Sequence, residues 1–131
     1  MSPRSTEFMA AARDQLAAAR AALGASAPSG AVSSAYYAML NAALAALSEH
    51  DEHARTHAGV WHLFHERFVV TGQFPAELHR EAQRSQEDRI GADYRAVVPG
   101  VARAAEVVEV AERFVDEVAT RFGDQPRDDS D

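Results

Sequence analysis

Apolar residues three and four positions apart recur along most of this 131-residue chain, and that spacing constrains its fold more than any other feature. It places apolar side chains on one face of a helix, which then packs against a core. The spacing is clear in residues 2–24, 32–49, 57–70 and 100–122. No segment alternates apolar and polar residues as a half-buried strand would. The sequence therefore predicts an all-α, up-and-down bundle of four to five helices.

The first two helices are predicted to be joined by a short loop at residues 25–30, which contain Pro28 and Gly30. The first helix has one apolar stripe: Met9, Ala12, Leu16, Ala19 and Leu23. The second has two adjacent apolar faces: Tyr36, Leu40, Ala43 and Leu47 on one, and Ala35, Met39, Ala42 and Ala46 on the next. A helix that is apolar on two faces is expected to lie at the centre of the bundle.

The other helices follow a polar connector at residues 50–56, where Thr56 is predicted to cap the third helix. A fourth helix is predicted to open at Pro75. Its only sizeable apolar residues are Leu78 and Ile90, so it is expected to lie at the surface or line a polar groove. The last helix has a predicted core stripe: Val101, Ala105, Val108, Ala111, Val115, Val118 and Phe122. Residues 1–123 are thus one predicted bundle, and residues 124–131 a disordered acidic tail.

Composition excludes several classes of function. The chain has no cysteine and no lysine, so disulfides, thiolate metal sites and a lysine phosphate loop are all excluded. A net charge of −7 argues against wrapping duplex nucleic acid or binding an anionic membrane surface. We found no apolar run of the roughly 18–20 residues that a membrane span needs, and no signal-peptide pattern. A cytoplasmic protein without a cofactor is the expectation.

Histidines gather in one part of the chain. Five of the six lie between His50 and His65, close to several carboxylates. Zinc needs three or four converging ligands, and paired Glu-x-x-His motifs of the two-metal bundles are missing here. We therefore predict no metal site and interpret these histidines as a solvated connector.

Three segments, in order, carry a resemblance to a known family. They are residues 33–39 (Ser-Ser-Ala-Tyr-Tyr-Ala-Met), residues 55–60 (Arg-Thr-His-Ala-Gly-Val) followed by Phe64 and Phe68, and residues 89–94 (Arg-Ile-Gly-Ala-Asp-Tyr). Together they resemble the small single-domain branch of the HEPN family. The resemblance implies a four- to five-helix bundle that pairs as a homodimer. It also implies partnership with a minimal nucleotidyltransferase, often as a toxin–antitoxin-like pair, and association with nucleotide or RNA.

Many members of that family are metal-independent ribonucleases that use an Arg-x4–6-His motif. Counting from Arg89, the histidine positions hold Tyr94, Arg95 and Ala96 instead. Arg55 and His62 have the right spacing but lie in the connector region. The resemblance therefore favours a non-enzymatic binding module, with an altered-motif ribonuclease as the alternative and a scaffold without a nucleic-acid role as a third possibility.

The resemblance assigns a nucleotide, RNA or partner groove to Arg89, Asp93 and Tyr94, with Tyr37 and His57 in support. Arg89 and Asp93 are four apart, so a simple ion pair on one helix face is an equally open interpretation. Arg89 is not on a predicted core stripe. We expect the fourth helix to bury its arginines only against acidic groups of a partner, which favours a dimer.

Overall fold

The computed structural model describes residues 1–94 and 98–123, apart from the side chains of Ala92 and Asp93. Within these residues it consists of helices, with one π-helical turn and no strand. The elements are α1 (Pro3–Gly24), α2 (Pro28–Glu49), α3 (His57–Phe64), η1 (His65–Val69), α4 (Ala76–Tyr94) and α5 (Val101–Phe122). The predicted all-α bundle is confirmed, whereas the predicted tail at residues 124–131 lies outside the described residues.

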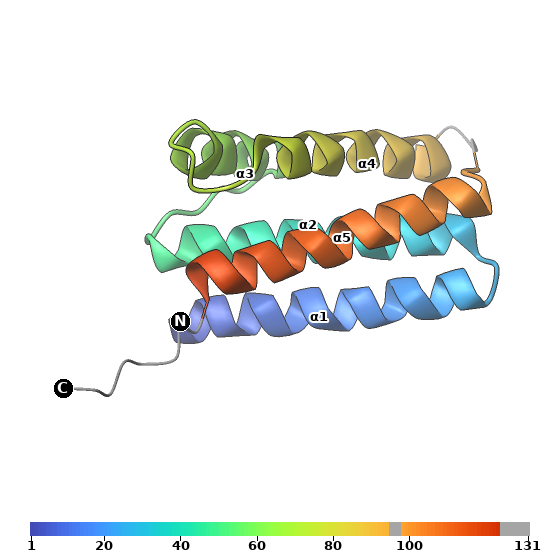
Figure 1. The fold of residues 1–131 in the computed structure, drawn as a ribbon, viewed down its shortest axis with the longest axis horizontal. Coiled ribbons are helices and arrows are strands. Elements are labelled where there is room, and N and C mark those ends of the chain that lie inside the picture. The colour runs from blue at the N-terminus through green and yellow to red at the C-terminus, as the bar shows by residue number, and fades with distance from the viewer. Residues whose placement is uncertain (95–97, 124–131) are drawn as a thin grey trace.

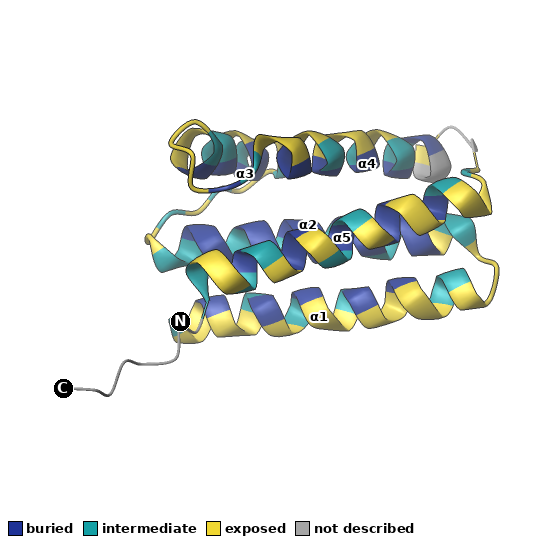
Figure 2. Cartoon of the chain, in the orientation of Figure 1, coloured by how far each residue is buried: buried dark blue, intermediate teal, exposed yellow. Residues whose placement is uncertain are grey.

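The four long helices run side by side with alternating direction, and the short α3 lies across the end of the bundle where α4 begins (Figure 1). Helix α2 contacts α1, α3, α4 and α5. Both of its predicted apolar faces are buried (Figure 2). Many of these side chains are alanines, which let neighbouring helices approach closely. The prediction that this helix is central is confirmed.

The loop between the first two helices is shorter than predicted. Helix α2 begins at Pro28, so only residues 25–27 connect it to α1. Proline suits the first turn of a helix, because its missing N–H would have no intrahelical partner there. The sequence-based reading treated Pro28 as a loop residue and overlooked this role.

The third predicted helix divides into two parts. Its start is as expected, because the Thr56 hydroxyl caps α3 by accepting a 2.9 Å hydrogen bond from the Gly59 N–H. At His65 the backbone widens into the π-helical turn η1, which ends at Val69 rather than Val70. A π turn inserts an extra residue into the helix and is often found near functional sites.

Two predicted core faces need correction. In α5 the buried residues include Ala104, Val107 and Phe114, whereas Val101 and Ala105 of the predicted stripe are exposed. In α4 the buried face contains polar as well as apolar side chains: Leu78, His79, Ala82, Ser85 and Arg89. The positions of Leu78, Ala82, Ser85 and Arg89 are spaced four, three and four apart. That is a core stripe in which polar residues replace apolar ones.

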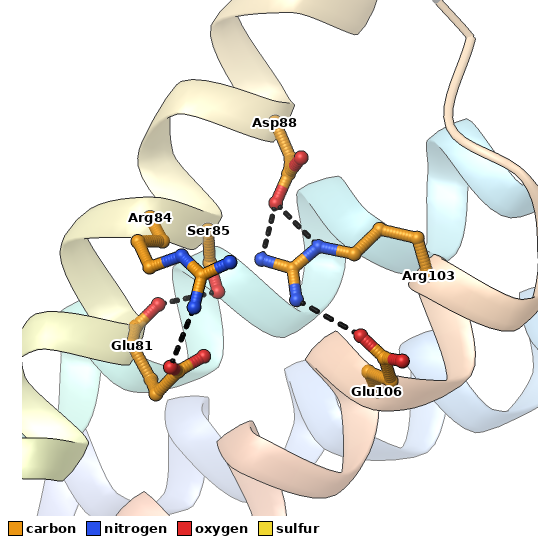
Figure 3. A network of polar contacts seen from close by, with 6 residues as sticks. All are labelled: Glu81, Arg84, Ser85, Asp88, Arg103 and Glu106. Carbon is orange, nitrogen blue, oxygen red and sulfur yellow. Dashed lines mark hydrogen bonds and ion pairs between the residues drawn. The ribbon is translucent and has the colours of Figure 1, made fainter.

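An arginine on α5 ties that helix to α4 (Figure 3). The Arg103 Nε and Nη2 atoms both donate to one Asp88 oxygen, at 3.0 and 2.7 Å, and Nη1 donates to Glu106 at 3.2 Å. These bonds raise the pKa of Arg103 against the lowering effect of its partial burial, so its charge is retained. The outer side of the polar helix α4 is thus fixed to α5 within the chain.

Helix α2 is, by length and a mean hydropathy of 1.2, long and apolar enough to cross a membrane, which the sequence-based reading did not anticipate. Of that apolar window, 67% is buried inside the bundle. The central helix of a globular core meets the same criteria, so its composition is accounted for by its position in the fold.

The aromatic centre of the core should dominate stability. Phe64 is fully buried and packs against Phe68, Phe74 and Phe114. Phe64→Ala should lower the free energy of unfolding by about 3–5 kcal/mol, because it leaves a cavity there. Val70→Ala, at a 63% exposed position, should change it by no more than about 0.5 kcal/mol. Urea denaturation followed by circular dichroism would measure both, and equal effects would contradict this description of the core.

Candidate functional site

A buried tyrosine hydroxyl joins α2 to α3. The Trp61 indole N–H donates a 3.2 Å hydrogen bond to the Tyr36 hydroxyl, which also lies 3.2 Å from the His57 Nδ1 atom. Because indole only donates, the Tyr36 oxygen is the acceptor in the first bond and its own proton is left for His57. In the tautomer that carries its proton on Nε2, His57 Nδ1 accepts this hydrogen bond.

Burial and charge favour this arrangement. Burial raises the pKa of Tyr36, so its hydroxyl stays protonated and can donate. Burial, and then the positive charge of Arg89, lower the pKa of His57 from its ordinary value of 6.5. His57 is therefore neutral at pH 7, as its role as an acceptor from Tyr36 requires.

Arg89 lies against the same aromatic residues. Its guanidinium carbon is 5.0 Å from the centroid of the Tyr36 ring and 5.6 Å from that of Tyr37. Cation–π contacts of this kind are worth more when they are shielded from water. Arg89 is only 8% exposed, so the expectation that it lies off the core and needs a partner chain for burial is wrong. Other groups of the same chain bury it.

The predicted groove residues divide into two sets. Tyr37, His57 and Arg89 come together: the Tyr37 and His57 rings meet edge to face with centroids 5.8 Å apart, and both residues are half-buried. We call these three residues the Tyr37–His57–Arg89 cluster. Tyr94 is 75% exposed at the end of α4, and the side chain of Asp93 lies outside the described residues. The sequence-based reading missed Tyr36 and Trp61 as the residues that hold the cluster.

A second group of polar residues lines a pocket of about 550 Å³ between α3, η1 and α4. The polar side chains along it are His62, His65, His79, Arg80, Gln83 and Gln86. His79 is 4% exposed, and burial lowers its pKa, with His65 and Arg80 adding to the effect. The signal for His79 in the sequence was its place beside Leu78, on the inner side of α4. Among the side chains that the structure describes, no three histidine or carboxylate groups are placed to hold a metal ion.

The fold and this cluster define a class: a small helical bundle with an arginine and a histidine brought together between its second, third and fourth helices. The family model of the HEPN domain matches residues 5–121. The chain therefore belongs to the HEPN family, as the three sequence segments indicated. Comparison with curated proteins gives no match.

The pKa of His57 should report the proximity of Arg89. In the native protein it should lie below 6.5, and Arg89→Met should raise it, since one of the two lowering effects is removed. Arg84→Met, at an exposed position of α4, is the matched control and should leave it unchanged. Titration of the imidazole signals by NMR would measure all three. An unchanged or lower pKa in Arg89→Met would show that the two groups do not interact.

Proposed function

We propose that this chain is a non-enzymatic HEPN module of the cytoplasm that acts as a homodimer and binds a nucleotide or short single-stranded RNA at the Tyr37–His57–Arg89 cluster. The most direct support is that the half-buried rings of Tyr37 and His57 lie beside the guanidinium of Arg89. Aromatic and imidazole rings provide stacking surfaces for bases, whatever the base. The charge of Arg89 makes the same place attractive to a phosphate.

The charge of the chain favours a short ligand. A net charge of −7 repels a long phosphate backbone, and salt-dependent binding of extended nucleic acid needs many basic contacts. A single nucleotide or a few unpaired bases need only the local positive charge of the cluster. The proposal is therefore a compact site rather than a basic surface.

Self-association is supported by exposed apolar residues at the connection between α4 and α5. Tyr94, Val98 and Val101 are all exposed, although each is large and apolar. Such side chains near one another in the chain suit a contact with a second copy. Following the family resemblance, we also propose a minimal nucleotidyltransferase as the partner protein, in a toxin–antitoxin-like pair.

A metal-independent ribonuclease is the second candidate, and one observation favours it. The Arg-x4–6-His spacing is missing after Arg89, yet the fold brings Arg89 close enough to His57 to lower the pKa of that histidine. A neutral imidazole can accept a proton from a ribose hydroxyl, and an arginine can stabilise the charge that develops on phosphate. The deep burial of Arg89 favours binding over catalysis.

Binding should depend on the exposed rings of the cluster. Tyr37→Leu and His57→Gln should each weaken binding of a fluorescent single-stranded RNA by roughly tenfold or more, because each removes a stacking surface. Arg84→Gln removes one positive charge elsewhere on α4 and should have little effect. Fluorescence anisotropy in the presence of EDTA measures affinity, and gel analysis of the same samples detects cleavage. Equal affinity in all variants would refute the proposed site, and cleavage lost in His57→Gln would establish the ribonuclease instead.

The proposed dimer makes a separate prediction. Light scattering should give twice the 14.2 kDa mass of one chain. Tyr94→Asp should shift the equilibrium toward monomer, because a charge placed in an apolar contact is costly. Val70→Asp changes another exposed apolar position, directly after η1, and should leave the dimer intact. A monomer at micromolar concentration in the native protein would refute the dimer, and equal effects of both variants would refute the surface.

A further inference from the structure

The pocket between α3, η1 and α4 differs in charge from the rest of the chain. Its polar lining consists of three histidines, Arg80 and two glutamines, and among the lining residues that the structure describes there is no carboxylate. The whole chain contains 20 acidic and 13 basic residues, so such a lining is unusual here. Ala76, the first residue of α4, also lies on the pocket. The start of a helix adds partial positive charge.

His79 is the deepest polar group of this pocket. Its ring lies parallel to that of Phe64, with centroids 6.2 Å apart, and meets the Trp61 ring at 6.0 Å. Its Nε2 atom is buried without a hydrogen-bond partner. Burial lowers the pKa of His79, and the Trp61 backbone acts in the opposite direction. A buried polar atom without a partner is unfavourable, and a ligand that pairs with it removes that cost.

His65, which also lines the pocket, packs against His79. The His65 ring packs against the His79 ring with centroids 5.1 Å apart, and the His65 side chain is 44% exposed. Exposed side chains change rotamer readily, so His65 can turn toward solvent at low cost. Such a turn would uncover His79 on the side of the pocket, which Arg80 also lines.

We propose that this pocket binds a phosphate monoester, whose oxygens are held by Arg80, His62 and His65, and that His79 takes up a proton from solvent as the ester binds. A tetrahedral dianion accepts several hydrogen bonds at once and so matches this many donors better than a carboxylate does. The volume of about 550 Å³ exceeds what a free phosphate ion needs, which leaves room for the organic group of an ester. This site is separate from the Tyr37–His57–Arg89 cluster and does not depend on the proposed function.

Proton uptake follows from the surroundings of His79. The charged or titratable groups around it are His62 from α3, His65 from η1 and Arg80 from α4. A carboxylate oxygen of Glu66 lies 3.6 Å from the His65 Nδ1 atom. Helix α5 contributes the apolar Phe114, which packs against Trp61. Without ligand, His79 is neutral at pH 7. A bound dianion favours the protonated imidazole, since Nε2 can then donate to it. Affinity should therefore rise as pH falls through the pKa of the complex, and level off below the lowered pKa of the free protein.

Isothermal titration calorimetry with phenyl phosphate and with sulfate, in EDTA, tests this proposal. Sulfate does not titrate near neutral pH, so any pH dependence of its binding belongs to the protein. Both anions should bind, and the affinity for sulfate should rise roughly tenfold from about pH 8 to about pH 6. Phenyl phosphate, whose own second pKa is about 6, is compared at pH 7 and above. Titrations in two buffers of different ionisation enthalpy should show uptake of about one proton.

Variants with matched controls connect the binding to these residues. Arg80→Gln, at an exposed position, should weaken both anions by roughly tenfold or more without affecting folding. His79→Phe keeps an aromatic ring in place and should abolish the proton uptake. Arg84→Gln and His53→Gln are controls outside the pocket, and His57→Gln tests independence from the proposed RNA site; all three should bind as the native protein does. No binding at millimolar anion, or equal binding in Arg80→Gln, would overturn the proposal.

Discussion

The hydrogen bond between the Trp61 indole and the Tyr36 hydroxyl is the interaction on which the rest of this structure depends. Both side chains are almost completely buried, so neither polar group could turn to water if the other were lost. It fixes α3 against the central helix, and the orientation of α3 then places His57 beside Tyr37 on one side and the Trp61 ring beside His79 on the other. Arg89 brings α4 to the same point by covering the Tyr36 ring.

The Tyr37–His57–Arg89 cluster and the pocket between α3, η1 and α4 are therefore connected through Trp61. The Trp61 ring is 6.3 Å from the Tyr36 ring and 6.0 Å from the His79 ring, between centroids. Packed aromatic rings in a core shift together rather than deform individually. A ligand that moved His79 would press on Trp61, and through its indole N–H on the hydroxyl that orients His57.

Much of the fold could be predicted because the stripes of α1 and α2 are apolar, and an apolar stripe identifies its own buried face. The Thr56 cap could also be predicted, because a capping hydroxyl bonds to the backbone only three residues further along the chain. The inner face of α4 could not be assigned in that way: its stripe passes through Ser85 and Arg89, which are polar. Whether a polar residue faces inward depends on the side chains that other helices place against it. Arg89 faces inward because the Tyr36 and Tyr37 rings of α2 lie beside its guanidinium. For the same reason the motif around Arg89 indicated the right helix but not the depth of its arginine, and spacing along the chain could not show that His57 lies beside it.

The distribution of charge affects which ligands the region around α3 could attract. An acidic chain that exposed its arginines evenly would attract neither nucleic acid nor small anions. Here Arg103 is neutralised by Asp88 on the outer side of α4, whereas the charge of Arg89 is strong enough at His57 to lower the pKa of that imidazole. Arg89 thus acts on an imidazole, whereas Arg103 is paired with two carboxylates. If the α3 region binds phosphate as proposed, the net charge of −7 would disfavour a long phosphate polymer more than a small phosphate or a few unpaired bases.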